Sequence, residues 1–510
     1  MLAVFLILAA APPGPPQGMI RSALGVDRDG AAIECWLAPE DLDYHTSKPR
    51  VLVLGAPEAA SESLRRRYAI SVVPGPVPAR GYPPQGEYYG RAGDPAAAYL
   101  WRWIGMHAPD LVVEIRAGPK RRWQIPEAPH PVLQRLARRL RPVEVLQPSD
   151  ELVFLLARGA PAGTGPIPAV RAEGNPAALL AELLRAAGTI PPSPARREIQ
   201  SRLDRTPRQV AGQLAAHYGH DLNEVMYQPA LALIGRLRLG ERADVERIVA
   251  PYFTGVRPAL PAKPSGSHLS GHLVFGELAS LTGQPRYTEL VRAAADLDPM
   301  RFHNEMSDAV FMSCPLLARA GRLTGDAKYF DLCLHHMRFM LKLNLRTDGL
   351  HRHSPLDETA WGRGNGFPAL GLALSLTDLP HDHPGRPEML QAFRAHLEAL
   401  ARHQDTSGAW RQVIDHPGSY RELTATAMIG FALRRGIRSG WLDPARFQPL
   451  LDRAWYAVRA RVAPNGELVD VCTGTGKQKS LRDYLDRAAI LGPDPRGGAM
   501  ALLLSTEMIP

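Results

Sequence analysis

Two heptapeptides, Leu281-Thr-Gly-Gln-Pro-Arg-Tyr287 and Leu323-Thr-Gly-Asp-Ala-Lys-Tyr329, share a Leu-Thr-Gly start and a tyrosine four residues after the glycine. A shorter copy is Leu239-Gly240. The three glycines lie 43 and 42 residues apart, a spacing that accommodates two helices of three to four turns and their connections. Each glycine follows an apolar helical segment, where a helix end with left-handed backbone is expected. The repeat therefore predicts a series of helical hairpins.

The same helical periodicity extends from residue 201 to residue 510. Apolar residues recur at helical spacing in about twelve segments, which are joined by short loops containing Gly, Pro, Asp or Asn, and the strand signal disappears. Six hairpins of this kind suit a closed (α/α)6 barrel, a six-hairpin toroid. An open helical solenoid has the same local signature, so periodicity alone leaves both folds open.

The first third of the chain has a different pattern. Short apolar runs typical of strands, at residues 51–54, 111–115 and 152–156, alternate with stretches of helical periodicity. The helical stretches are residues 58–68, 97–106 and 176–187. This order predicts a small α/β domain with a partly parallel sheet over residues 19–187.

The chain is long enough for two domains, and a linker candidate lies between the two patterns. Thr189-Ile-Pro-Pro-Ser-Pro-Ala195 is rich in proline and small residues, which predicts a linker at residues 188–200. The predicted order is therefore an α/β accessory domain, this linker and an (α/α)6 domain at residues 201–510. The first domain carries no recognisable catalytic signature, and its function stays open.

The N-terminus resembles a secretory signal. An apolar run at residues 2–11 is followed by Pro12 and Pro13, and it is too short to span a bilayer. We expect a signal peptide at residues 1–18 and a periplasmic or secreted protein; a membrane-tethered or frayed terminus is the alternative. No later segment predicts an integral membrane helix.

Charge and cysteine content narrow the possible ligands. Lys and Arg total 60 against 51 Asp and Glu, a net charge of +9, but the excess is spread along the chain without a nucleic-acid motif. An acidic oligosaccharide fits this charge and nucleic acid does not, although a solvated basic surface explains it equally well. Cys35, Cys314, Cys333 and Cys472 are widely spaced, which predicts buried free thiols rather than a disulfide framework or zinc site.

The first candidate site segment is residues 302–312, Phe-His-Asn-Glu-Met-Ser-Asp-Ala-Val-Phe-Met. Asp308 stands at the start of a strongly apolar helical run. A carboxylate at that position often does no more than interact with the helix dipole. Asp308 is therefore a candidate whose catalytic role needs further support.

The second candidate segment combines two imidazoles, an Arg, a Trp and closely spaced glycines. It contains His351 and His353, then Trp361-Gly-Arg363-Gly-Asn-Gly, a composition that lets backbone and side chains approach a polar ligand. Two histidines at positions i and i+2, without a nearby Cys or Glu cluster, are more typical of a hydrogen-bonding pair than of a metal site. We therefore predict no metal and no cofactor.

Two further segments carry polar and aromatic residues. In the third, residues 404–412, Trp410 and Arg411 follow a turn, a pairing suited to sugar stacking and carboxylate binding, although a core Trp fits as well. The fourth, residues 470–478, contains Gly-Thr-Gly-Lys but lacks the spacing of a phosphate-binding loop.

The chain has neither a Gly-x-Ser-x-Gly elbow nor a His-Glu-x-x-His helix, so the commonest hydrolase chemistries are not indicated.

In order, these segments resemble the unsaturated rhamnogalacturonyl and glycuronyl hydrolases, bacterial enzymes that finish the degradation of pectin fragments left by polysaccharide lyases. The resemblance covers about residues 205–508. Its motifs are Asp308-x-x-Phe-Met312, Gly349-Leu-x-x-His353, Trp361-Gly-Arg-Gly-Asn-Gly366, Gln404-Asp-x-x-Gly-x-Trp410, Val471-Cys-x-Gly-Thr475 and the closing Gly497-Gly-Ala499. The resemblance implies an (α/α)6 barrel and a glycoside hydrolase.

The resemblance also implies roles for individual residues. Asp308 would be the general acid/base that protonates C4 of a terminal unsaturated uronic acid while water adds at C5; the resulting hemiketal opens and releases the remaining sugar. His353 and Arg363 would hold the uronate, with Trp361 walling the pocket and Trp410 as a further substrate-binding candidate. An Arg fork suits a carboxylate independently of any family.

Two positions depart from the family pattern. The family usually carries a second important Asp at the start of an earlier helix, and residues 265–272, Ser-Gly-Ser-His-Leu-Ser-Gly-His, contain no carboxylate. Phe367 stands where Trp is commoner, which preserves packing but removes an indole donor. Two alternatives therefore stay open: a non-catalytic glycan-binding scaffold, and another (α/α)6 enzyme such as a lyase or epimerase.

Overall fold

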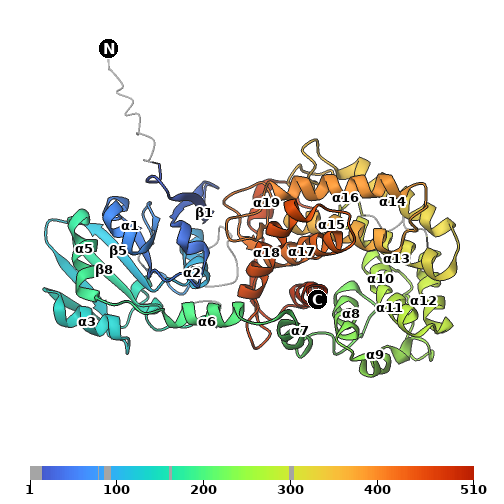
Figure 1. The fold of residues 1–510 in the computed structure, drawn as a ribbon, viewed down its shortest axis with the longest axis horizontal. Coiled ribbons are helices and arrows are strands. Elements are labelled where there is room, and N and C mark those ends of the chain that lie inside the picture. The colour runs from blue at the N-terminus through green and yellow to red at the C-terminus, as the bar shows by residue number, and fades with distance from the viewer. Residues whose placement is uncertain (1–13, 79, 85–93, 160–162, 298–303) are drawn as a thin grey trace, which may run out of the picture.

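The computed structural model describes residues 14–510 except residues 79, 85–93, 160–162 and 298–303. Figure 1 shows a sheet-bearing unit in blue and green beside a helical unit that runs from green to red. Residues 1–13 of the expected signal peptide lie outside the described residues. Among the described helices, none is both long and apolar enough to cross a membrane.

The first unit is built on a sheet that has eight strands in the described residues, in the order β1-β2-β4-β3-β5-β8-β6-β7. Strands β4, β3, β5 and β8 pair in parallel, whereas β1–β2 and β8–β6 are antiparallel. The predicted partly parallel sheet is confirmed. Its strands are β1 (Ile20–Val26), β2 (Ala32–Leu37), β3 (Arg50–Gly55), β4 (Ala69–Val73), β5 (Leu111–Ala117), β6 (Arg122–Pro126), β7 (Val143–Leu146) and β8 (Ala169–Gly174).

Helices cover both faces of this sheet because successive strand side chains point in opposite directions. Val51 and Val53 of β3 belong to one apolar cluster with α3 and α5, and Leu52 and Leu54 to another with α2 and α4. The elements around the sheet are η1 (Pro39–Leu42), η2 (Pro57–Ala59), α1 (Glu62–Arg67), α2 (Pro95–His107), α3 (Pro131–Arg139), α4 (Leu152–Leu156) and α5 (Pro176–Ala187).

The prediction of a strand at residues 152–156 is wrong, because these residues form helix α4. A five-residue apolar run suits a buried strand or a buried helical turn equally well. Here the carbonyl of Glu151 accepts from the N–H groups of Phe154 and Leu155, both at 3.1 Å, and starts a helix that buries most of its side chains.

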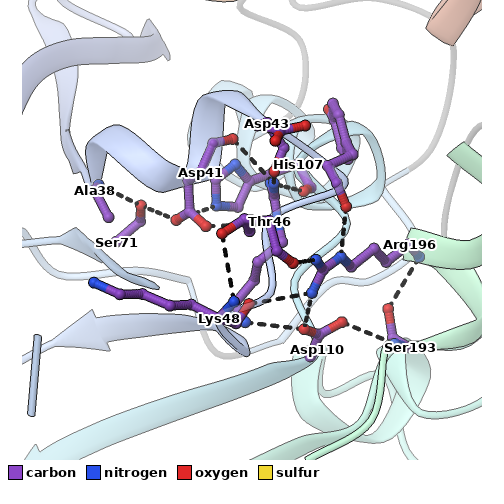
Figure 2. A network of polar contacts seen from close by, with 12 residues as sticks. Ala38, Asp41, Asp43, Thr46, Lys48, Ser71, His107, Asp110, Ser193 and Arg196 are labelled. Carbon is purple, nitrogen blue, oxygen red and sulfur yellow. Dashed lines mark hydrogen bonds and ion pairs between the residues drawn. The ribbon is translucent and has the colours of Figure 1, made fainter. Parts of the chain in front are cut away.

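The predicted linker at residues 188–200 contains the first turns of helix α6 (Pro194–Leu203), which is anchored to the sheet. Figure 2 shows the anchor: the carboxylate of Asp110 accepts from Arg196 Nη1 at 2.6 Å and from the N–H of Ser193 at 2.8 Å. Arg196 Nε also donates to the carbonyl of Tyr44 at 2.8 Å. Because Arg196 and Asp110 are both buried, the end of this segment is held by charge-assisted hydrogen bonds.

Inner helices of the second unit form a closed ring in the described residues. Helix α8 contacts α10 and α11, and the ring continues through α13, α15, α17 and α20, which contacts α8 again. Helices α7, α9, α12, α14, α16 and α18 pack around it. The helices are α7 (Pro207–Ala215), α8 (Tyr227–Arg238), α9 (Arg242–Val249), α10 (Gly266–Gly271), α11 (Leu273–Thr282), α12 (Pro285–Ala295), α13 (Ala309–Thr324), α14 (Lys328–Asn344), α15 (Gly362–Asp378), α16 (Arg386–Ala401), α17 (Leu423–Arg438), α18 (Pro444–Arg461), α19 (Leu481–Leu485) and α20 (Pro495–Glu507), with η4 (Ala250–Tyr252) after α9.

The repeat glycines occupy the predicted conformation. Gly240, Gly283 and Gly325 have φ angles of +94°, +68° and +72°, and the last two are the C-caps of α11 and α13. A residue with a Cβ would be strained at these helix ends. The prediction of hairpin boundaries from these glycines is confirmed. The four cysteines are also buried free thiols, as predicted.

The expectation that strands disappear after the linker is wrong. Two short two-stranded sheets lie among the loops, formed by β9 (Trp410–Arg411) with β10 (Arg421–Glu422) and by β11 (Leu468–Cys472) with β12 (Ala489–Gly492). Pairs of two to five residues have too few alternating positions to stand out in a sequence pattern. They nevertheless position loops near the candidate site.

The two units share an apolar cluster. Leu24 and Tyr99 of the sheet unit belong to it together with Trp361, Val469 and Tyr484 of the helical unit. In Figure 1, β1 and α2 lie on the side of the sheet unit that faces the helical unit. The sheet unit therefore packs directly against loops of the helical unit.

Candidate active site

A pocket of about 240 Å³ lies where several inner helices begin. Residues at or near the starts of α8, α10, α13, α15 and α20 line it. Since the N-terminal end of a helix carries partial positive charge, this convergence favours an anionic ligand. The lining residues are Tyr227, Gln228, Ser265, Gly266, Ser267, Asn304, Met306, Asp308, Ala309, Met312, Trp361, Arg363, Phe367, Gly474, Thr475 and Arg496.

The side chain of Asp308 lines the pocket and does not cap its helix. It immediately precedes α13, yet its side chain makes no capping hydrogen bond. Its Oδ1 lies 3.5 Å from Nε2 of His353, and 13% of the side chain is exposed. The neighbouring Ser307 holds the segment in place, because its N–H donates to the carbonyl of His353 at 2.9 Å and its hydroxyl to that of Gly364 at 2.6 Å.

His353 supports Asp308 from behind. It is fully buried and is not among the residues that line the pocket. Its Nδ1 lies 2.8 Å from the hydroxyl of Tyr484. Burial raises the pKa of Tyr484 to about 12, so the phenol keeps its proton and can donate it to Nδ1. With Nδ1 accepting this hydrogen bond, the imidazole N–H is on Nε2, which faces Asp308.

Arg363 brings a buried positive charge to the pocket. Its Nη1 and Nη2 donate to the carbonyls of Cys472 and Thr473, each at 2.7 Å, and its guanidinium lies 4.7 Å from the ring centre of Trp361. No ion pair to Arg363 is found in the described part of the chain, although only 3% of the residue is exposed. The carbonyls orient the guanidinium without neutralising it, so an incoming carboxylate would be a favourable partner.

Trp361 and Phe367 complete the apolar part of the wall. Trp361 also packs its ring at 4.4 Å from the imidazole of His353. Phe367 stacks on Phe311 at 5.4 Å and meets Tyr227 edge-on at 5.7 Å. The structure therefore brings three of the candidates, Asp308, Trp361 and Arg363, into one pocket and places His353 directly behind it.

Trp410 lies elsewhere, in the core of the helical unit. It is not among the lining residues; 1% of it is exposed and its indole N–H donates to the carbonyl of Leu400 at 2.8 Å. The neighbouring Arg411 pairs with Asp405 at 2.5 Å instead of reaching a ligand. The core alternative for this tryptophan fits the geometry, and the substrate-binding interpretation does not.

We expect the change Trp410→Phe to lower the free energy of unfolding by about 2 kcal/mol, because it strands a buried carbonyl and leaves a small void. Urea denaturation measures this loss. The KM for substrate should stay at the wild-type value. A raised KM with unchanged stability would instead place the indole against the substrate.

His351 does not form the hydrogen-bonding pair predicted with His353. It is fully buried, its ring lies edge-on at 4.6 Å from that of His396, and its ring nitrogens have no hydrogen-bond partner among the described residues. Burial lowers the pKa of His351 well below its ordinary value, so it is a neutral core residue.

Hydroxyl groups occupy the pocket wall where the expected second carboxylate is missing. Ser265 and Ser267 line the pocket. The hydroxyl and N–H of Ser265 lie 2.7 and 3.0 Å from Nδ1 of His268, whose Nε2 lies 2.6 Å from a carboxylate oxygen of Glu224. Because Nδ1 accepts from an N–H group, the proton of the neutral imidazole is on Nε2 and faces Glu224.

Sequence reasoning missed several lining residues. Tyr227 and Arg496 lie at the starts of α8 and α20, where ordinary helix-start patterns gave no reason to single them out. The position of Arg496 directly before the Gly497-Gly-Ala499 motif could have marked it as a candidate site residue. Its guanidinium pairs with Asp494 at 2.5 Å, so it contributes less free charge than Arg363.

Comparisons with known proteins match the helical unit. The model of Glycosyl Hydrolase Family 88 matches residues 271–510. An unsaturated rhamnogalacturonyl hydrolase of Bacillus subtilis is 34% identical over 186 residues, which are 35% of this chain and 52% of that protein. An unsaturated 3S-rhamnoglycuronyl hydrolase of Formosa agariphila is 29% identical over 171 residues, 30% of this chain and 45% of that protein. The chain thus spans about half the length of these curated relatives.

Solved structures share the fold. A possible GH105-family member from Klebsiella pneumoniae superposes with a TM-score of 0.51 at 20% identity, covering 61% of this chain and 93% of that one. At this identity the similarity concerns the fold alone. Residues 271–510 are thus similar to Glycosyl Hydrolase Family 88, and the two relatives named above are unsaturated rhamnogalacturonyl and 3S-rhamnoglycuronyl hydrolases, the kind of enzyme that the sequence motifs resemble.

Proposed function

We propose that this protein is a glycoside hydrolase that removes a terminal 4,5-unsaturated uronic acid from an acidic oligosaccharide by hydrating its double bond. One observation carries the proposal: a carboxyl group not used for capping, Asp308, and a buried guanidinium without an ionic partner in the described residues, Arg363, line the same pocket. The family match and the relatives' names support the reaction class. We further propose pectin-derived, rhamnogalacturonan-like fragments as substrates, following the Bacillus subtilis relative.

The chemistry needs one carboxyl group that gives a proton and then helps water attack. Protonated Asp308 would deliver its proton to C4 of the unsaturated ring as the C4–C5 π bond breaks, and the carboxylate would then accept a proton from the water that adds at C5. The product is a hemiketal, which opens and releases the remaining sugar. One water is consumed for each bond cleaved, and Asp308 returns to its starting protonation state.

Arg363 and the helix starts would bind the substrate carboxylate. The guanidinium uses Nη1 and Nη2 hydrogens on two carbonyls, and Arg has five N–H donors in all. The remaining donors can bind a carboxylate, whose negative charge also favours the converging helix N-termini. Ser265 and Ser267 would contact sugar hydroxyls in the place of the missing carboxylate.

We also propose that the ring of helices is an (α/α)6 barrel at residues 201–510, preceded by an accessory domain at residues 19–187 and a connecting segment at 188–200. The contacts that close the ring from α20 to α8 support the barrel over an open solenoid.

We propose export to the periplasm or the medium through a signal peptide at residues 1–18. N-terminal sequencing of the protein recovered from the producing cell tests this. A mature chain beginning near residue 19 is expected, and a chain that retains Met1 would contradict export by this route.

The test of the proposed activity uses oligouronides generated by a polysaccharide lyase. Wild-type protein should remove the ultraviolet absorbance of the conjugated double bond and release a saturated sugar. Binding on a glycan array without any loss of absorbance would favour the scaffold alternative. New absorbance from saturated polysaccharide would indicate a lyase.

A further inference from the structure

The contact between the two units includes a buried ion pair. Nη2 of Arg102, on α2 of the sheet unit, lies 2.8 Å from Oδ1 of Asp470 on β11 of the helical unit, and the two side chains are 7% and 9% exposed. Nη1 of Arg102 donates to the carbonyl of Ala489 on β12 at 2.5 Å. A single side chain of the sheet unit thus binds both strands of this two-stranded sheet.

Asp470 is the irregular residue of β11. Val469 pairs with Leu491 and Val471 with Ile490, so Asp470 is an extra residue that forms a bulge. Its φ is +62°, a left-handed conformation that an Asp tolerates better than most residues but that still costs energy. The ion pair with Arg102 stabilises the charge of Asp470 in this buried, kinked position.

The bulge lies two residues before the groups that orient Arg363. These groups are the carbonyls of Cys472 and Thr473, which accept the two hydrogen bonds from the Arg363 guanidinium. The N–H of Cys472 donates to Glu422 at 2.9 Å, and that of Thr473 to the carbonyl of Ala488 at 3.0 Å. A shift of β11 would therefore move both carbonyls and, with them, the guanidinium in the pocket.

Apolar packing connects the same elements. Tyr99 of α2 belongs to one buried cluster with Cys472, Trp361 and Tyr484. The Arg363 guanidinium stacks over the ring of Trp361, and the hydroxyl of Tyr484 contacts His353. Helix α2 of the sheet unit thus packs against residues that hold the Arg363 guanidinium in the pocket.

We propose that the sheet unit is a positioning element for the substrate pocket, and that Arg102 and Asp470 are positioning residues that hold Arg363 for the substrate carboxylate. This rests on the proposed function, in which Arg363 binds the uronate. It assigns a role to a domain whose sequence carries no recognisable catalytic signature.

The test compares three variants of the full chain, Arg102→Met, Asp470→Asn and the double variant, with wild type. Asn also tolerates left-handed backbone, so Asp470→Asn removes the charge while keeping the bulge. We expect the KM for the unsaturated oligouronide to rise about tenfold in each single variant, with kcat within about threefold, which is the usual size of an energetic coupling through a packed contact. The double variant should be no worse than the singles, because both changes remove the same pair.

Tyr456→Phe is the matched control. The Tyr456 hydroxyl accepts from the N–H of Tyr44 at 3.0 Å and so also makes a hydrogen bond between the units, but on α18 instead of β11. Hydrogen exchange provides a readout that needs no turnover. The amides of residues 468–475 should exchange faster in the Arg102 and Asp470 variants than in wild type, and should not change in Tyr456→Phe.

Each outcome decides between the proposals. A raised KM together with faster exchange in residues 468–475, absent from the control, supports the positioning role. An unchanged KM, a loss confined to kcat, or the same effect in Tyr456→Phe overturns it. If wild type does not turn over the oligouronide, the proposed function fails, and unchanged exchange at residues 468–475 would then overturn the positioning role by itself. If Arg102→Met does not fold, the Asp470→Asn and double variants decide.

Discussion

The change Asp308→Asn is expected to lower kcat by about 1,000-fold, the usual contribution of a general acid and base. The amide has nearly the same shape but neither gives a proton to C4 nor accepts one from water. Substrate binding should change little, since Arg363 and the helix starts carry the attraction for the uronate. The rate at which the double-bond absorbance disappears measures the effect.

The control is Asp296→Asn, the same chemical change at a half-exposed carboxylate that bonds the hydroxyl of Tyr329 at 2.8 Å and does not line the pocket. Its kcat should equal that of wild type. Asp308 makes no capping hydrogen bond, so Asp308→Asn should lose at most about 1 kcal/mol of stability from the helix dipole. If kcat falls less than about tenfold in Asp308→Asn, the loss is much smaller than that expected for a general acid/base, and the assigned role is wrong.

The change Arg363→Met is expected to raise KM about 50-fold, because a hydrogen bond to a charged group contributes about 1.5–3 kcal/mol and each 1.4 kcal/mol is tenfold. Arg363→Lys should recover only part of this loss. A lysine keeps the charge but has no planar fork to bind the Cys472 and Thr473 carbonyls and a carboxylate together. Initial rates over a range of oligouronide concentrations measure both values.

A modified substrate gives the matched control for Arg363. Methyl esterification of the terminal uronate removes its negative charge, so the ester should bind wild type about as weakly as the acid binds Arg363→Met. The variant should discriminate little between acid and ester. If Arg363→Met still prefers the acid as strongly as wild type does, the carboxylate binds elsewhere in the pocket.

Part of the site could be predicted because its residues lie at helix starts. Asp308, Trp361 and Arg363 stand immediately before or within the first turn of inner helices, and in a closed ring such positions on alternate helices meet at one end. Trp410 also follows a turn, but the short β9 strand directs its indole toward Leu400 in the core. The direction of a side chain after a turn depends on tertiary packing, which local pattern does not specify.

The helical repeat was predictable for a local reason. Gly240, Gly283 and Gly325 adopt left-handed backbone at helix ends, and this conformational requirement is a property of the residue itself. The run at residues 152–156 had no such marker. Five apolar residues bury themselves equally well as a strand or as a helical turn, and the surrounding structure selected the helix.

Local sequence was enough to predict the helix ends marked by Gly240, Gly283 and Gly325, the apolar faces of the inner helices, and a general acid/base candidate, Asp308, at the start of α13. The contact of His353 with Asp308, and that of Arg102 of the sheet unit with Asp470 on β11, become visible only in the folded chain. Helix ends and faces follow from interactions within a few residues. The pairing of Arg102 with Asp470 joins positions far apart in the chain and depends on how two folded units pack, which no local spacing encodes.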